Sequence, residues 1–83
     1  MTQAELDAFA RRAKRVYEDS IRGAVEQAHL HNYVAIEPDS GRYFLGETYS
    51  EAVAAAQAAM PNQLVHTVRV GHAAALHLGA AGL

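Results

Sequence analysis

The first 28 residues repeat hydrophobic positions at steps of three and four, the spacing that places side chains on one face of an α-helix. The series runs through Leu6, Phe9, Ala13, Val16, Tyr17, Ile21, Ala24, Val25 and Ala28. Thr2 followed by Glu5 has the spacing of a capping box, in which each side chain accepts a hydrogen bond from a free backbone N–H at the helix start. The pattern predicts a helix over about residues 3–28.

Beyond residue 32 the hydrophobic period changes to the two-residue repeat of β-strands. Val34 and Ile36 share one face of a strand over 33–37. The sequence Pro-Asp-Ser-Gly over 38–41 has the residue types of a tight turn, and a second strand follows over 42–46. These segments predict an antiparallel hairpin.

A second helix and a third strand follow the hairpin. Thr48 and Glu51 repeat the capping-box spacing ahead of a helix over 49–60, which Pro61 terminates. Residues 64–70 then alternate between two faces. One face carries Leu64, His66, Val68 and Val70, and the other carries Val65, Thr67 and Arg69. We expect the first of these faces to lie in the core.

The uncharged tail over 71–83 fits two structures. Gly71 and His72 between two apolar runs suit a hairpin turn, which favours a fourth strand. The alanines favour a short helix that ends at Gly79. In both cases we expect the tail to dock on its own sheet or on a second copy of the chain, with Leu76 and Leu78 in contact.

These elements predict an α+β fold with a small, mostly antiparallel sheet in a single domain over 1–83, made of an N-terminal helical arm over 1–30 and a ββαβ unit over 31–83. A helix of about 26 residues is about 39 Å long, whereas a globule of this size has a radius of gyration of about 12 Å. We therefore expect the helix to overhang the body and a second copy to cover its surplus apolar surface. The alternative is that Gly23 divides the helix.

A homo-oligomer is accordingly expected, with a dimer favoured. The expected interface residues are Leu6, Phe9, Val16, Tyr17, Ile21, Tyr33, Tyr43, Leu76 and Leu78. Tyr33 and Tyr43 cluster with Phe44 and Tyr49 around the hairpin, where such amphipathic aromatic residues serve either the edge of a core or a protein interface.

Composition narrows the class of protein. A chain of 83 residues buries only about 60 to 65% of its unfolded surface, so burial through self-association is expected. The absence of cysteine excludes disulfides and thiolate zinc sites and fits a reducing cytoplasm. A net charge of −2 gives no general attraction to nucleic acid. No apolar stretch reaches the roughly 20 residues of a membrane span, and the N-terminus lacks the pattern of a signal peptide. We expect a cytoplasmic protein that binds neither nucleic acid nor membrane.

The histidines are the main candidates for metal chemistry: His29, His31, His66, His72 and His77. In an extended segment His29 and His31 would share a face, and His66 with His72 or His77 would come from a neighbouring strand. No metal-binding helical His pair or H-E-x-x-H motif is present. Surface or interface histidines and no cofactor are therefore expected, and metal binding is the alternative.

Residues that resemble catalytic groups have structural explanations. Ser40 lies in a turn and Ser50 in a first helical turn, and no serine lies in a G-x-S-x-G elbow. Glu37 and Asp39 flank a turn, where acidic residues are common. The basic cluster over 11–15 is flanked by acidic residues, which favours ion pairs within the helix. We expect that the chain is not an enzyme.

The segment GRYFLGETYSEAVAAAQAAMPNQLVHTVRVG over 41–71, preceded by YVAI over 33–36, resembles a family of short bacterial proteins of unknown function. In that family a YVAI strand, an FLG strand, a T-x-x-EA helix start and a VRVG strand recur in this order, over a region matching 33 to about 79. The resemblance implies a small α+β unit without established activity. The genes of such proteins lie beside those of retropepsin-like aspartic proteases, which implies a second small protein as partner.

The chain also resembles the sheet domain of HicB-type antitoxins in a G-x-T-x-x-EA helix start, here Gly46, Thr48, Glu51 and Ala52. Those antitoxins add a DNA-binding segment for which this chain has no room, so repressor activity is not implied. The leading functional hypothesis is a non-enzymatic protein–protein interaction module that self-associates. The alternatives are a small-molecule or metal-binding domain that uses His and Tyr side chains, and an antitoxin-like inhibitor of a small partner protein.

Overall fold

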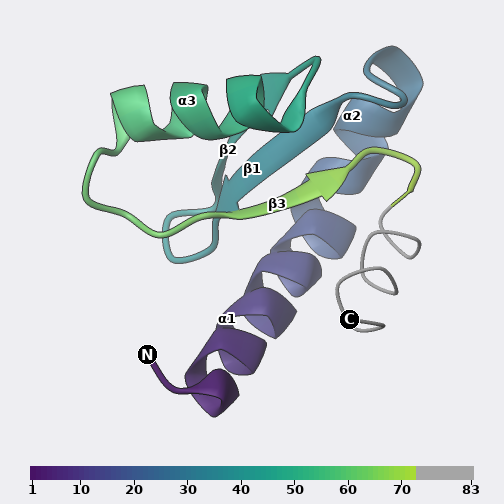
Figure 1. Ribbon diagram of the computed structural model, residues 1–83. Helices are drawn as coiled ribbons and strands as arrows, with labels where there is room; N and C mark the ends of the chain where they lie inside the picture. The colour runs from purple at the N-terminus through teal and green to yellow at the C-terminus, as the bar shows by residue number, and fades with distance from the viewer. Residues whose placement is uncertain (73–83) are drawn as a thin grey trace.

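A computed structural model describes residues 1–72, in which a three-stranded sheet lies between helical layers (Figure 1). The elements are α1 (Gln3–Val16), the π-helical turn η1 (Tyr17–Ile21), α2 (Arg22–Ala28), β1 (Tyr33–Glu37), β2 (Arg42–Gly46), α3 (Tyr49–Ala59) and β3 (His66–Arg69). The predicted α+β class is confirmed. The tail beyond 72, including the choice between strand and helix, lies outside the described residues.

The predicted N-terminal helix is present as one helical rod made of α1, η1 and α2. Its capping box is formed: the Thr2 hydroxyl accepts from the Glu5 N–H at 3.1 Å, and the Glu5 carboxylate accepts from the Thr2 N–H at 2.8 Å. Gly23 lies inside α2 and does not interrupt the helix, so the alternative of a helix divided there is wrong.

The π turn has a cause in the spacing of the buried residues. Phe9, Ala13, Tyr17, Ile21 and Val25 are buried and recur at steps of four. In a regular α-helix of 3.6 residues per turn, a step of four rotates the side chain by about 40° away from its predecessor. A π turn holds more residues and corrects part of this drift. The rod therefore keeps one line of side chains against the sheet.

The expected overhang of the helix is wrong for most of its length. Ala13, Tyr17, Ile21 and Val25 are at most 1% exposed because they pack on the chain's own sheet, against Val34, Ile36, Val68 and Val70. A body with a radius of gyration of 11.9 Å has a longest dimension of 35 Å, close to the length of the rod. Only the first turns extend outward, where Leu6 is 42% exposed.

The sheet has the strand order β2-β1-β3, with both pairs antiparallel. The hairpin register runs from Tyr33 opposite Gly46 to Glu37 opposite Arg42, which confirms the predicted hairpin. The third strand is shorter than predicted and pairs with β1 from Tyr33 opposite Arg69 to Ile36 opposite His66. Because β2 and β3 flank β1, α3 connects them by crossing over the central strand (Figure 1).

The two faces of the sheet are covered by different helices (Figure 1). On the face opposite the rod, Ala35 packs with Ala52 and Ala56 of α3, and these small side chains let the helix lie close to the strands. Val65 joins this second cluster. Leu64 is 48% exposed because β3 begins only at residue 66, so its predicted core position is wrong.

Candidate functional site

The outer edge of β2 is a candidate interaction surface. Among the described residues β2 pairs with β1 alone, so the backbone groups on its other side have no strand partner. Tyr43, opposite Ile36 in the hairpin register, is 38% exposed. Unpaired edges with exposed apolar side chains readily accept a further strand. We call this surface, made of Arg42, Tyr43, Phe44 and Leu45, the β2 edge.

Aromatic side chains also lie beside the β2 edge, on the face of the sheet that α3 covers, where Tyr33 of β1 and Phe44 of β2 pack against the alanine cluster. The Tyr33 ring meets the Tyr49 ring edge-on, with centroids 6.3 Å apart, and Tyr49 is 56% exposed. The Arg42 guanidinium lies 5.2 Å from the centre of the Phe44 ring. Tyrosine, phenylalanine and arginine are enriched at protein interfaces relative to the remaining surface. The surroundings of the β2 edge therefore have the composition of a binding surface.

The structure divides the predicted interface residues by burial. Phe9, Tyr17 and Ile21 lie in the core, Val16 and Tyr33 are half-buried, Leu6 and Tyr43 are exposed, and Leu76 and Leu78 lie outside the described residues. The three core positions are corrected: Tyr17 and Ile21 pack on the chain's own sheet, and Phe9 is buried, so none of them is available to a second copy of the folded chain. The periodic pattern marked a buried face correctly but did not show what covers it.

The histidines do not form the group that the sequence suggested. His29 ends α2 and His31 has a φ of 74°, so the extended segment that would place both on one face is not present. His66 lies at the start of β3, and His77 lies outside the described residues. Within residues 1–72 no three His, Asp or Glu side chains are placed to share a metal ion.

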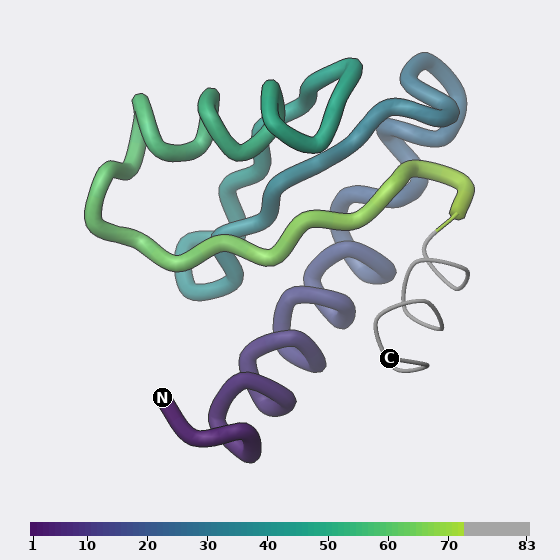
Figure 2. The backbone as a smooth tube through the Cα atoms, in the orientation of Figure 1, coloured from purple at the N-terminus to yellow at the C-terminus, as the bar shows by residue number. Residues whose placement is uncertain are grey.

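A different histidine pair is present, formed by residues 41 positions apart. His31 Nδ1 and His72 Nε2 lie 2.6 Å apart, with ring centroids separated by 4.8 Å. The pair joins the loop before β1 to the turn after β3, two segments that lie side by side in Figure 2. Periodicity does not reveal such a pair, because it depends on the antiparallel register of β1 and β3.

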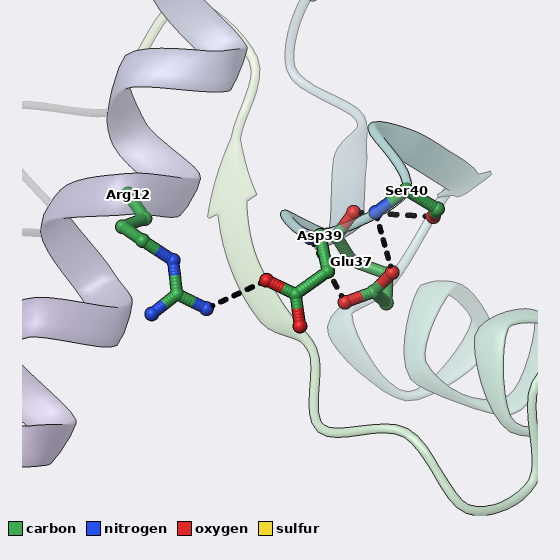
Figure 3. A network of polar contacts seen from close by, with 4 residues as sticks. All are labelled: Arg12, Glu37, Asp39 and Ser40. Atoms are coloured by element: carbon green, nitrogen blue, oxygen red, sulfur yellow. Dashed lines mark hydrogen bonds and ion pairs between the residues drawn. The ribbon is translucent and has the colours of Figure 1, made fainter.

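The carboxylates around the hairpin turn have separate structural partners (Figure 3). Glu37 is 2% exposed, and its carboxylate accepts from the backbone N–H of Ser40 at 2.8 Å and of Asp39 at 3.1 Å. Burial alone raises the pKa of the Glu37 carboxyl. The hydrogen bonds from Ser40 and Asp39 and the charge of Arg12 outweigh burial, so the pKa of Glu37 lies below its ordinary value.

Arg12 corrects the prediction that the basic cluster is paired within the helix. Its guanidinium lies 2.9 Å from the Asp39 carboxylate, which joins α1 to the tip of the hairpin (Figure 3). Pairs within the helix are made instead by Arg22, with Glu18 at 2.7 Å and Glu26 at 2.9 Å. These charges are exposed to solvent, or half-buried in the case of Glu26, so each pair contributes little to stability.

Tyr17, expected on the apolar helix face and at an interface, carries a buried polar group that the sequence pattern did not reveal. Its hydroxyl is fully covered and makes no hydrogen bond within the described part of the chain. Burial raises the pKa of Tyr17, and the charge of Glu26 raises it further. The Gly71 backbone acts in the opposite direction, but its geometry does not meet that of a hydrogen bond.

Comparison of the chain with protein-family models, with curated proteins and with solved structures found no match. None of the helices over residues 1–72 has the length and apolar character to cross a lipid bilayer.

Proposed function

We propose that this chain is a non-enzymatic interaction module that self-associates through the β2 edge, where two copies pair their β2 strands antiparallel. The observation that carries the proposal is the unpaired outer side of β2 with Tyr43 exposed on it. Addition of a strand to an open edge supplies main-chain hydrogen bonds, and the side chains on alternate positions supply specificity. The product is one continuous six-stranded sheet, twice the three strands of one copy.

Symmetry fixes the way in which two copies meet. An antiparallel edge pair has its two-fold axis perpendicular to the sheet, so the layers of the two copies stay on the same side. The register centred on β2 then places Phe44 opposite its own copy and Tyr43 opposite Leu45 of the second chain. Paired residues share a face, as the pleat requires. Aromatic and branched side chains opposite each other stabilise such a pair.

Charge supports the same orientation. Arg42 begins β2, and Glu47 follows its last residue. Antiparallel pairing brings the basic end of each strand to the acidic end of the other, whereas parallel pairing would bring like charges together. A chain of 83 residues also leaves much of its apolar surface exposed, so burial at an interface adds stability. A cytoplasmic location is part of the proposal, supported by the absence of cysteine from the sequence.

Sedimentation equilibrium with a chelator present tests the proposal. We expect the wild-type chain to sediment at twice its monomer mass of 8.9 kDa. Tyr43→Lys places a charge on the β2 edge and is expected to give a monomer, because an edge lysine opposes strand pairing.

The matched control is Leu64→Lys, which introduces the same charge at another exposed apolar residue, away from β2. This variant is expected to remain dimeric, and circular dichroism establishes that both variants are folded. A monomeric wild-type chain at high micromolar concentration, or a Tyr43→Lys variant that is still dimeric, contradicts the proposal.

A further inference from the structure

Two imidazole nitrogens face each other at one end of the sheet. His31 belongs to the loop between α2 and β1, and His72 to the turn that follows β3, and these segments lie side by side in Figure 2. The distance between His31 Nδ1 and His72 Nε2 is 2.6 Å. At this distance one ring donates a hydrogen to the lone pair of the other, so the two rings share one proton between them.

The backbone holds both rings in place. The His31 N–H donates to the Val70 carbonyl at 3.0 Å, and the His31 carbonyl accepts from Arg69 Nε at 3.0 Å. The His72 N–H donates to the Arg69 carbonyl at 2.9 Å. A ligand that binds both rings therefore meets a nearly preformed pair and loses little of its binding energy in ordering them.

The conformation of His31 is a second, independent observation. Its φ of 74° lies in the left-handed region, which few residues other than glycine adopt and which costs free energy unless the surroundings fix it. Histidine is among the residue types enriched there. In this conformation the His31 imidazole lies against that of His72, with ring centroids 4.8 Å apart.

We infer that His31 and His72 form a two-ligand site for one divalent transition-metal ion that prefers imidazole, such as Zn²⁺ or Cu²⁺. Two nitrogen ligands at 2.0 to 2.1 Å from a tetrahedral ion lie about 3.3 Å apart. The two nitrogens therefore need to separate by about 0.7 Å from their present 2.6 Å. Rotation of the rings provides this movement while the backbone stays in place. The ring that donated the hydrogen takes the tautomer that carries it on the other ring nitrogen, so both facing nitrogens bind the ion through their lone pairs and no net proton is released.

Water supplies the remaining ligands of the ion. His31 is exposed and His72 is half-buried, so an ion reaches both rings without opening the core. The site has only two protein ligands, and the guanidinium of Arg69 is bonded to the His31 carbonyl close by. Both features make binding weaker than in a structural zinc site with four protein ligands. The site thus suits reversible loading, and this inference does not depend on self-association.

Isothermal titration of the full chain with ZnCl₂, CuCl₂ and MgCl₂ at neutral pH tests the inference. We expect one Zn²⁺ per chain, tighter binding of Cu²⁺, and no binding of Mg²⁺, which prefers oxygen ligands. Nuclear magnetic resonance of the imidazole nitrogens is expected to show the signals of His31 and His72 shifting with Zn²⁺.

Variants assign the ligands. His31→Asn keeps a residue that tolerates the left-handed conformation, and His72→Gln keeps a polar side chain of similar size. Each is expected to weaken Zn²⁺ binding by roughly tenfold or more, since loss of outer contacts alone has effects of this size. His29→Gln removes a neighbouring histidine as control and is expected to bind like the wild type. Absence of Zn²⁺ binding by the wild-type chain, or wild-type affinity in either ligand variant, overturns the inference.

Discussion

One glycine, Gly46, determines how closely α3 can approach β2. A Cβ atom added to Gly46 would collide with the backbone N of Ala52 and lie 2.8 Å from Glu51. These atoms belong to the first turns of α3, which cannot move without leaving the sheet. Glycine at the end of β2 therefore allows α3 to start directly over the strand that precedes it.

Gly46→Ala is expected to lower the free energy of unfolding by about 1 to 3 kcal/mol, as overpacking does in other cores. Gly23→Ala is the matched control, because a Cβ atom at Gly23 meets nothing within 4 Å and the residue lies inside α2. This control is expected to raise the free energy of unfolding by about 0.5 to 1 kcal/mol, the helix preference for alanine. Urea denaturation measures both. Equal effects of the two substitutions would show that space around Gly46 is not limiting.

The buried carboxylate of Glu37 links stability to pH. Its pKa is lowered in the folded chain from an ordinary value of 4.5, so the folded state favours the ionised form more than the unfolded chain does. The stabilisation is fully present above the ordinary pKa and is lost as the pH falls through the lowered one. We expect the free energy of unfolding to decrease in this acidic range.

Glu37→Gln is expected to flatten this decrease and to destabilise the chain at neutral pH by about 1 kcal/mol. Glutamine has a single, neutral acceptor oxygen, so one of the two N–H groups of Asp39 and Ser40 loses its bond and the other bonds to an uncharged acceptor. Urea denaturation at a series of pH values measures both effects. Asp19→Asn, which removes one negative charge from an exposed helical position, is the control for net charge. An unchanged slope in Glu37→Gln would assign the acid sensitivity to other groups.

For single residues, the sequence pointed to side chains of interest but did not show which residues they contact. The turn was predicted to explain Glu37 and Asp39, and both make contacts there, but nothing in the pattern showed that the Glu37 carboxylate turns back onto Ser40. The pair of His31 and His72 depends on a strand register and on a left-handed backbone, neither of which leaves a local signal. Contacts between residues far apart in sequence are the ones that local spacing cannot supply.

Among the elements, the N-terminal helix and the two strands of the hairpin match their predicted limits, and α3 ends one residue early. These limits are set by caps, turn residues and periodicity, which act within a few residues. The first helix carries a full capping box. At the start of α3 only the first bond of the box is formed, in which the Thr48 hydroxyl accepts from the Glu51 N–H at 3.1 Å. The Glu51 carboxylate accepts instead from the N–H of Glu47 at 2.9 Å. The cap thus includes Glu47, the first residue of the connection from β2.

Thr48→Ala is expected to lower the free energy of unfolding by about 1 kcal/mol, because the first turn of α3 loses its cap where it is packed on the sheet. Thr2→Ala removes the same interaction from a terminal turn that frays at little cost, so its expected effect is a few tenths of a kcal/mol. Thermal unfolding followed by circular dichroism compares the two. A larger loss in Thr2→Ala would mean that the start of α1 is as firmly held as the start of α3.

Two element features were beyond the sequence pattern. The third strand is shorter than predicted because of the length of its partner β1, which ends at Glu37. In the register that pairs Ile36 with His66, Leu64 lies beyond the end of β1 and has no residue of that strand opposite it. The π turn η1 corresponds to a feature of the sequence, the step of four between buried residues from Phe9 to Val25, but this feature can be recognised only once the structure is known. A step of four is also compatible with a regular amphipathic α-helix, so the pattern alone does not distinguish a regular helix from one with a π turn.

For the whole molecule, the pattern predicted the fold class but not the arrangement of layers. Both faces of β1 carry apolar residues, and four of its five residues are buried, which is the mark of a strand covered on both sides. The overhang was expected because the length of the helix was set against the radius of gyration of the body. The relevant length is the longest dimension of the body, 35 Å, since the helix lies along it. The apolar face of the rod is therefore covered by the chain's own sheet, and the β2 edge is the surface that we propose for a partner.

The crossing of α3 over the central strand sets an order for synthesis. As the chain leaves the ribosome, the hairpin is complete and α3 has been made before residues 66–69 exist. Until then β1 is an open border on the side that later meets β3. We therefore expect nascent chains that pause before this point to expose β1 to other molecules, and we expect the pairing of β3 with β1 to come late in folding, because these strands are far apart in the sequence.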